Sequence, residues 1–314
     1  MNGTYPGIEV SQLARTRPII WGIDPTGAAD ALTMPNKVWY VYGIDGGIGV
    51  DTNSGETPWA PFLTITKALS MCVATRRDYI VVLDYWQPTG ETWPISVNVN
   101  NVHIIGADGG GTQMPIITPT GNTAGISVAA DRVEIAYLCI NGGAAHGCIE
   151  NDPGAPTARW GTFVHDCWFA VLGSAQDGIK NVAASDNVYL DVRRCRFGYA
   201  LTRDGIRIEH NATRAYIGAP WGEGNVFERP AGVGVNLVGN AVGSGIYHNT
   251  FICESDAQGK AVTLSAGCTD VVIAHNVANF GNAAMAANPY DDGAGVDANH
   301  WMNNMHNITL TDPA

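Results

Sequence analysis

Residues 190–197 read LDVRRCRF, an order of apolar, polar, apolar, paired charged, small and aromatic residues that returns through most of the chain. Copies of this pattern run from about residue 100 to residue 281. The position that Cys195 holds in this pattern is occupied in successive copies by Leu138, Cys167, Cys195, Asn225, Asn249 and Asn276. The steps between these positions are 29, 28, 30, 24 and 27 residues. A period in this range indicates one supersecondary unit stacked on copies of itself.

A second marker has the same period, since a Gly followed by an apolar residue opens a short alternating segment at 125–126, 147–148, 178–179, 205–206 and 232–233. Short strands without an intervening helix fit one coil of a parallel β-solenoid, whose stacked strands lie ~4.8 Å apart. The sequence therefore predicts an all-β, single-stranded parallel β-helix. A β-sandwich with chance spacing is the alternative, but sandwich strands do not keep a fixed register of this kind.

Stacking turns equivalent positions into columns, and one column should lie inside the coil. It would hold Cys167, Cys195, Asn225, Asn249 and Asn276 as a structural ladder. An inward Asn at a bend can bond to its neighbours and satisfy polar groups that a buried turn would otherwise leave unpaired. The seven cysteines form no CxxC pair and no zinc-type spacing, so we expect buried, reduced thiols and no metal.

The start of the repeat region carries a resemblance to a known family. Residues 39–69 read WYVYGIDGGIGVDTNSGETPWAPFLTITKAL, and residues 78–109 read DYIVVLDYWQPTGETWPISVNVNNVHIIGADG. From about Val38 to Gly281 the chain resembles the right-handed parallel β-helix superfamily with the pectate-lyase-like fold, and most of all bacteriophage spike and decoration proteins. The resemblance implies a fold and not one activity, because this fold hosts lyases, hydrolases, epimerases and non-catalytic spikes.

Pattern changes divide the chain into four parts. Residues 1–36 form an irregular attachment arm, 37–99 a strand, loop and capping helix that lead into the first coil, 100–286 the coils, and 287–314 a C-terminal cap or extension. The short helix is expected to run from Thr64 or Thr66 to Ala74, where it would cover the otherwise open end of the solenoid. Asp45, Asp51 and Asn53 could bind calcium, but their spacing does not match an EF-hand loop, so no cofactor is expected.

Composition excludes several classes of function. The net charge of −12 argues against nucleic-acid binding, which needs a basic face, and disfavours a lyase that acts on acidic polysaccharide. The N-terminal residues lack the features of a signal peptide, and no run approaches the ~20 apolar residues of a membrane helix. We therefore expect a protein made in the host cytoplasm and located in a virion, without a membrane partner.

The first candidate catalytic group is Lys180, Arg207 and Glu209. Alternation predicts an outward column of Ser127, Ile149, Lys180, Arg207, Gly234 and Thr263, with Asn151, Glu209, Asn236 and Ser265 beside it. Lyases of the resembled family place a Lys or Arg base with acidic calcium ligands on this face. An ordinary surface ion pair is the alternative interpretation. The paired aspartates and Gly-His-Gly of galacturonan hydrolases and the Trp-x-Asp-His of pectate lyases are both absent from the sequence.

A second candidate pair lies at the turn before the ladder, where Asp166 should sit beside Arg194. A glycosidase needs two carboxylates ~5–9 Å apart, and Asp166 with Asp191 or Glu223 could supply them. Charges of alternating sign along a stack more often compensate each other, so an ion-pair network is the alternative.

Aromatic residues in the two longest loops suggest a third kind of site. Trp160 and Trp221 lie in these loops, and with Asn236 on the outer face they are candidates for glycan binding. Tryptophans of this kind also anchor protein interfaces.

Three functions remain open: a structural virion protein of a bacteriophage, a polysaccharide depolymerase, and a secreted lyase or hydrolase. The missing catalytic signatures and the irregular ends favour the first, a decoration protein, spike or fibre. We expect it to be non-catalytic and to bind host polysaccharide. The resemblance implies a homotrimer. A depolymerase should show converging carboxylates, whereas a decoration protein should show an apolar side face and an N-terminal arm on a neighbour.

Because residues 1–36 have no core of their own, we predict that they attach the protein to other virion proteins. A variant without them should keep the β-sheet circular dichroism of the full chain but no longer co-sediment with virions. Retained co-sedimentation would contradict the assignment of the arm.

Overall fold

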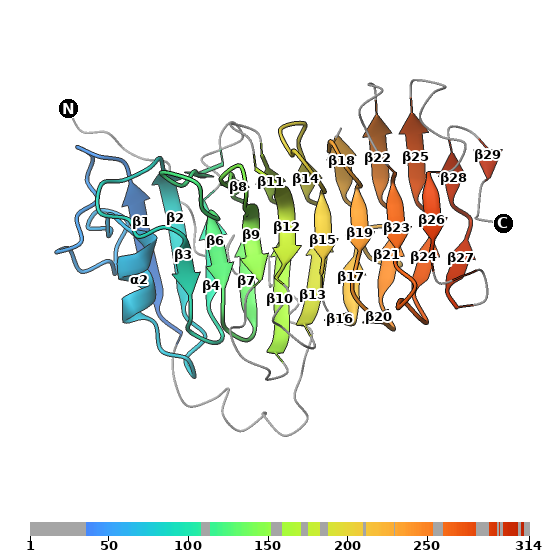
Figure 1. Ribbon diagram of the computed structural model, residues 1–314. Coiled ribbons are helices and arrows are strands. Elements are labelled where there is room, and N and C mark those ends of the chain that lie inside the picture. The colour runs from blue at the N-terminus through green and yellow to red at the C-terminus, as the bar shows by residue number, and fades with distance from the viewer. Residues whose placement is uncertain are drawn as a thin grey trace. The chain divides into compact units, whose positions relative to one another are not determined.

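The computed structural model describes residues 36–107, 114–151, 159–170, 175–182, 188–209, 212–228, 230–253, 260–280, 289–293, 295, 298–306 and 309–310. Within these ranges the chain is nearly all β, with one short helix near Lys67. Successive strands stack in parallel, so that residues 36–310 form a β-solenoid (Figure 1). The predicted fold class is confirmed. The arm predicted at 1–36 lies, except for Asn36, outside the described residues.

Most described strands belong to three long sheets. The ten-stranded sheet contains β1 (Val38–Gly43), β2 (Tyr79–Tyr85), β4 (His103–Gly106), β7 (Val133–Ala136), β10 (Arg159–His165), β13 (Val188–Arg193), β17 (Ala215–Ile217), β21 (Gly245–Tyr247), β24 (Val272–Ala274) and β27 (His300–Met302). The eight-stranded sheet contains β3 (Ile95–Val97), β6 (Ile126–Val128), β9 (Gly147–Asn151), β12 (Asp177–Asn181), β15 (Ile206–Ile208), β19 (Val235–Leu237), β23 (Val262–Leu264) and β26 (Tyr290–Asp292).

The nine-stranded sheet contains β5 (Ile116–Ile117), β8 (Cys139–Ile140), β11 (Trp168–Phe169), β14 (Arg196–Phe197), β18 (Val226–Glu228), β22 (Thr250–Cys253), β25 (Val277–Phe280), β28 (Met305–His306) and β29 (Thr309–Leu310). Its last pair, β28 with β29, is antiparallel. A small sheet pairs β16 (Ala212–Thr213) with β20 (Ala241–Val242).

The core follows from alternation along each strand, because successive side chains point to opposite faces of a sheet. In β15, for example, Ile206 and Ile208 are buried while Arg207 faces out. Inward rings of the nine-stranded sheet stack on one another: the centroids of Phe169, Phe197, Phe227 and Phe251 are 4.8, 4.5 and 4.8 Å apart. Each ring therefore buries both of its faces against the coils before and after it.

The ladder residues lie in one buried column beside these rings. The Oδ1 atom of Asn249 accepts bonds from the backbone N–H and the Nδ2 of Asn225, at 3.0 and 2.9 Å. The Nδ2 atom of Asn249 in turn donates to Ile217 O and to Oδ1 of Asn276. Asn276 repeats this arrangement with Asn304. The amides thus form a continuous hydrogen-bonded chain along the solenoid.

Cysteines take the place of asparagine in the earlier coils. The thiol of Cys195 lies 3.7 Å from Val164 O, and that of Cys167 lies 3.6 Å from Ile135 O, as an asparagine amide would contact the preceding coil. The backbone N–H of Cys195 donates to Asn225 Oδ1 at 2.9 Å, which joins the thiols to the amide chain. The six cysteines whose side chains are described are free thiols.

The helix α2 (Ile65–Met71) lies against β1, β2 and β3 (Figure 1). Thr64 caps its N-terminus by accepting a bond from the Lys67 N–H at 3.0 Å, and the carboxylate of Glu91 accepts from Ile65 and Thr66 N–H. Orphan amides of the first turn are thereby satisfied. The helix begins where Thr64 was expected to start it, and it ends at Met71, short of the predicted Ala74.

The outward column on the eight-stranded sheet differs from the expected one. Ile149 points inward and is fully buried, so Glu150 is the neighbour of Lys180. Asn236, and not Gly234, pairs with Arg207. The predicted column relied on the Gly-apolar pair at the start of each strand, and this marker is misleading at two strands. Residues 232–235 contain two such pairs, and in β9 the pair is offset by one residue from its position in the other strands. A slip of one residue moves a whole strand's side chains to the other face.

The coils also extend further than 286. Strands β26, β27 and β28 pair in parallel with β23, β24 and β25, so the region assigned as a C-terminal extension adds another coil. Asn304 continues the ladder 28 residues after Asn276, and Trp301 aligns with Ile273. The bulky Trp in an aliphatic position hides the pattern in the sequence.

Replacement of Asn249 by Leu tests the ladder. It removes the acceptor for the two Asn225 donors and the donor to Ile217 O, and each buried polar group left unpaired costs about 1–3 kcal/mol. We expect Asn249→Leu to lower the free energy of unfolding in urea by about 3 kcal/mol or more. The control is Asn279→Leu on the exposed face of β25, which should change it by less than about 0.5 kcal/mol. Equal losses in both variants would contradict this role.

Candidate functional site

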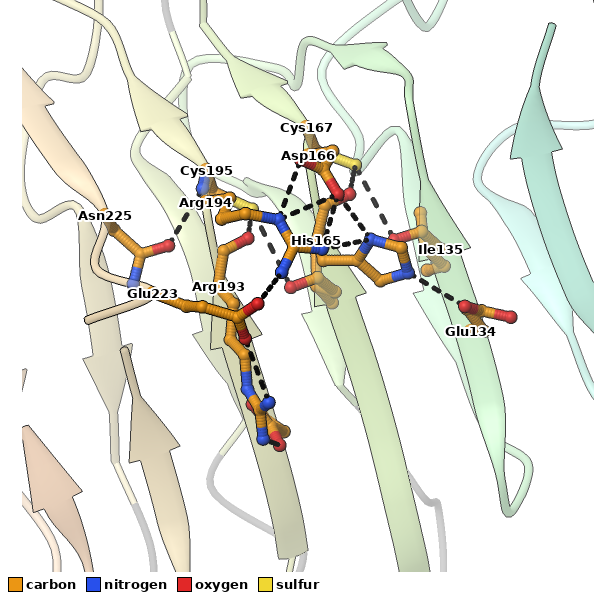
Figure 2. Close-up of polar contacts among 12 residues, drawn as sticks. Glu134, Ile135, His165, Asp166, Cys167, Arg193, Arg194, Cys195, Glu223 and Asn225 are labelled. Carbon is orange, nitrogen blue, oxygen red and sulfur yellow. Dashed lines mark hydrogen bonds and ion pairs between the residues drawn. The ribbon is translucent and has the colours of Figure 1, made fainter. Parts of the chain in front are cut away.

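Two clusters of ionisable and polar side chains lie on the outer faces of the solenoid. The first, the His165 cluster, consists of His103, Glu134, His165, Asp166, Asp191, Arg193, Arg194 and Glu223. Figure 2 shows part of this cluster, with Glu134, His165, Asp166, Arg193, Arg194 and Glu223 labelled. The second, the Lys180 cluster, consists of Asp177, Lys180, Arg203, Asp204, Arg207, Glu209 and Asn236.

The His165 cluster arises from outward positions of neighbouring strands in the ten-stranded sheet. Glu134 on β7 accepts from His103 Nδ1 at 2.5 Å and from His165 Nε2 at 2.8 Å. The other ring nitrogen of His165 lies 2.7 Å from Asp166. Because both ring nitrogens face carboxylates, the geometry selects the doubly protonated imidazolium of His165.

Backbone conformation directs the next side chains outward. Asp166 and Arg194 have φ angles of +53° and +50°, and each immediately precedes a ladder cysteine. A left-handed residue at this turn sends the ladder side chain inward and its predecessor outward, so that equivalent turns place Asp166 beside Arg194 with an Arg Nη2 to Oδ2 distance of 2.7 Å. The sequence expectation for this contact agrees with the structure.

Electrostatics in this cluster hold most groups charged. Burial opposes the imidazolium of His165, but bonds to Asp166 and Glu134 outweigh it and raise the pKa of His165 to about 9. Burial likewise opposes ionised Asp166, yet His165 and Arg194 lower the pKa of that carboxyl to about 2. Asp191 differs, since burial raises its pKa above the usual range despite its partner Arg193.

The candidate pair Asp166 and Asp191 is linked through other residues of the cluster. Arg194 joins Asp166 to Glu223 with an Arg to Glu distance of 2.6 Å, and Arg193 joins Glu223 at 3.2 Å to Asp191, which it holds with two bonds. Asp166, Asp191 and Glu223 thus each have a guanidinium partner. A glycosidase needs instead one carboxyl free to donate a proton and one free to attack or activate water.

The Lys180 cluster contains all three residues of the other catalytic candidate. Glu209 accepts from Arg207 Nε at 2.8 Å and lies 3.8 Å from Lys180 Nζ. Asp204 accepts from Arg207 at 2.8 Å and from the side chain of Asn236 at 3.0 Å. Lys180, Arg207 and Glu209 therefore lie together, as the predicted outward column implied. Each carboxylate of this cluster is already paired with a cation.

Burial governs the two acidic residues at the edges of this cluster. Asp177 is fully buried beneath Arg203, and that burial raises the pKa of its carboxyl even though Arg203 donates to it. Burial also opposes the ionised form of Glu209, but Arg207, Lys180 and Arg203 together lower its pKa below the usual range. The cluster thus holds Glu209 as a carboxylate next to two or more cations.

Of the glycan-binding candidates, Trp221 and Asn236 have described side chains. The Trp221 ring lies over the guanidinium of Arg193, with 4.8 Å between the carbon of the guanidinium and the ring centroid, and is 56% exposed. Asn236 lies in the Lys180 cluster on a different sheet. Trp160 belongs to β10, but its side chain lies outside the described residues.

Sequence reasoning missed several members of both clusters. His103, Glu134 and His165 are each 31 residues apart, one coil length, and this spacing was a usable signal. Asp177 and Asp204 each precede a Gly that opens a strand, 27 residues apart. Both signals become visible only when polar residues, as well as apolar ones, are aligned by the period.

Asp45, Asp51 and Asn53, the candidates for calcium binding, form hydrogen bonds that stabilise loops. Asp51 accepts from the N–H groups of Leu63 and Thr64 at 2.9 Å, and Asp45 accepts from Thr89. The side chain of Asn53 donates to carbonyl oxygens of the same loop. In the described part of the chain, no group of three or more His, Cys, Asp or Glu side chains is arranged to hold a metal ion. The helix in these ranges is too short to cross a membrane.

A comparison with known protein families found a match over part of the chain. The model of the family described as "Protein of unknown function (DUF1565)" matches residues 47–137, from the loop after β1 to the end of β7. This match and the parallel solenoid together fit a β-helix superfamily. Among curated proteins and among solved structures, no similar protein was found. Most residues of the two clusters follow the matched segment, so the match assigns them no role.

The His165 cluster gives the protein a defined pH dependence. The folded pKa of His165, about 9, lies above the ordinary value of 6.5, so its stabilisation is complete below about pH 6.5 and is lost as the pH rises through 9. At about 1.4 kcal/mol for each pH unit, the loss is on the order of 3 kcal/mol. Asp166 contributes a second dependence at acidic pH. Its stabilisation of the folded state is lost as the pH falls from about 3.8 through about 2.

We therefore expect the free energy of unfolding of the parent protein to fall between pH 6.5 and pH 9.5, and the His165→Gln variant to show a much flatter curve. The control is His275→Gln, which alters an exposed histidine stacked on His248 and should preserve the parent slope. Urea unfolding at several pH values measures both. A parent-like slope in His165→Gln would show that another group carries the dependence.

Proposed function

We propose that the chain is a structural protein of a bacteriophage virion, a capsid decoration, spike or fibre, which binds host-surface glycan without cleaving it. The observation that carries the non-catalytic part is the pairing of charges: each of the carboxylates in the His165 and Lys180 clusters has a cationic partner within the cluster. Such networks hold coils in register, whereas hydrolysis requires carboxyl groups that are free to exchange protons.

An apolar row on the nine-stranded sheet supports assembly. The register aligns residues of successive coils in one row: Ile116, Cys139, Trp168, Arg196, Val226, Thr250, Val277 and Met305. Cys139 is buried, and the other seven residues are at least partly exposed. The one ionised side chain of this row, Arg196, is neutralised by Glu228 through two bonds of 2.9 Å. A second copy of a chain with net charge −12 can approach this row without facing like charges.

We assign this row to the contact between copies in a homotrimer, the state that the resemblance to phage spikes implies. Attachment of the trimer to other virion proteins through residues 1–36 completes the proposal. A row of this kind is the flat apolar side face that distinguishes a decoration protein from a depolymerase in the sequence analysis.

A depolymerase is the second candidate, and one observation favours it. Burial raises the pKa of both Asp177 and Asp191, and carboxyls with raised pKa values are found among the general acids of enzymes. In that case Lys180, Arg207 and Glu209, or Asp166 with Asp191, would carry the reaction. A lyase of this kind could use calcium only through carboxylates that are bonded to arginine side chains in this structure.

Light scattering and a cleavage screen on the same sample separate the two candidates. We expect a mass three times the 33.2 kDa of the chain and no release of reducing ends from bacterial polysaccharides. Cleavage of any polysaccharide, abolished by Glu209→Gln or Asp191→Asn, would replace the structural proposal with the enzymatic one.

The apolar row gives a separate prediction. Val277→Asp places a charge near the C-terminal end of the row, two coils away from Val226, and should convert the trimer to monomer, because a buried unpaired carboxylate is costly at an interface. The matched control is Ser96→Asp, an exposed outward position on the eight-stranded sheet, which should remain trimeric. A trimeric Val277→Asp variant would place the interface elsewhere.

A further inference from the structure

The guanidinium of Arg193 contacts two aromatic rings on the outer face of the ten-stranded sheet. Its carbon atom is 5.5 Å from the ring centroid of Phe163 on β10 and 4.8 Å from that of Trp221, which follows β17. Two bonds to Asp191 and one of 3.2 Å to Glu223 hold the guanidinium in place. The indole is thus held on a rigid charged support.

The loop that carries Trp221 is built for a fixed conformation. Gly218 and Gly222 have φ angles of +80° and +103°, a region that side chains rarely adopt. A Cβ atom on Gly218 would lie 1.9 Å from Tyr247 O, so the loop begins in close contact with the next coil. The side chain of Trp221 also bonds to Glu223, which lowers the pKa of that carboxyl against the opposing effect of its burial.

The indole is nevertheless largely open to solvent. With Arg193 packed against its ring, Trp221 is still 56% exposed. A large aromatic side chain that is fixed in place and left open to solvent gives up burial that would stabilise the fold. A ligand that stacks on such a ring pays little conformational entropy, since the ring is already ordered.

Polar groups lie beside this ring. Glu223, about one-third exposed, bonds to the side chain of Trp221 and to Arg194. On the same sheet, Tyr216 on β17 pairs in register with Asp191, the partner of Arg193, and makes an edge contact of 5.8 Å with Tyr189. Rings that alternate with hydrogen-bonding groups suit a ligand with apolar C–H faces and hydroxyl edges.

We propose that Trp221 is the stacking platform of a binding site for a neutral glycan, with Glu223 and Arg194 as hydrogen-bonding partners of its hydroxyl groups. This inference rests on the proposed glycan-binding role and gives it a site and a ligand class. Neutrality follows from the charges: Arg193 and Arg194 are both bonded to carboxylates, so a uronate or sialate would meet Glu223 and Asp191 without an uncommitted cation in the cluster.

The chain offers a matched control in Trp86. This residue is 47% exposed and directly follows β2, as Trp221 follows β17 in the same ten-stranded sheet. It belongs neither to the His165 cluster nor to the apolar row. Removing its ring tests for general effects of losing an exposed tryptophan.

The full-length protein is screened on an array of bacterial surface glycans, neutral and acidic, and its strongest neutral ligand is titrated by calorimetry into the parent, Trp221→Ala and Trp86→Ala. We expect a neutral ligand whose Kd rises about tenfold or more in Trp221→Ala, equivalent to about 1.4 kcal/mol, and stays within about twofold in Trp86→Ala. Trp221→Phe, which keeps a ring, should recover part of the affinity. Thermal unfolding confirms that each variant is folded.

The outcomes separate the two proposals. Neutral glycan bound equally by parent and Trp221→Ala would overturn this site and leave the glycan-binding function standing. Preference for acidic glycans, or equal losses in Trp221→Ala and Trp86→Ala, would also overturn it. No glycan bound by the parent would remove both the site and the glycan-binding part of the function, and would assign the exposed indole to a protein partner.

Discussion

The chain of buried asparagine amides is the constraint on which the rest of the solenoid depends. A solenoid turn buries backbone groups at every coil, and each unpaired group would cost free energy that a repeated structure would multiply. In Asn225, Asn249 and Asn276 one side chain bonds to both the coil before it and the coil after it. Register between coils is therefore set by polar bonds as well as by the stacked phenylalanines.

The same turn also explains where the charged clusters lie. The residue before a ladder position adopts a left-handed conformation in several coils, including Asp166, Arg194, His248 and His275. Each such residue is directed outward and meets its counterpart in the next coil. Ion pairs such as Asp166 with Arg194, and the stacked rings of His248 and His275, follow from this repetition. Position in the coil, and not a catalytic arrangement, accounts for these contacts.

The outer faces of the sheets differ in chemistry although they share one backbone design. The ten-stranded sheet combines rings with ion pairs around Arg193, the eight-stranded sheet carries the dense Lys180 cluster, and the nine-stranded sheet carries an apolar row through Val226 and Val277. A solenoid can present such separate faces because each coil contributes one strand to each sheet. The proposals for glycan binding and for assembly therefore concern different sides of the same coils.

Several features were determined by the sequence alone. The period of the apolar and ladder positions is a local property of the chain, and it sufficed to predict the parallel solenoid, the helix at Thr64 and the meeting of Lys180 with Arg207 and Glu209. These predictions succeed because a fixed period places equivalent residues side by side whatever the loops between them do. The final coil was missed since Trp301 replaces an aliphatic residue, although Asn304 keeps the ladder.

Only the tertiary structure decided the faces and partners of individual side chains. A shift of one residue reverses a strand, so whether Ile149 or Glu150 stands beside Lys180 depends on how the coils pair, which the markers at 147–148 and 232–233 misjudge. Likewise, the position of Trp221 over Arg193 depends on the path of a glycine-containing loop, which has no period. Periodicity fixes what is repeated, whereas the loops and charges that distinguish this protein are set by three-dimensional contacts.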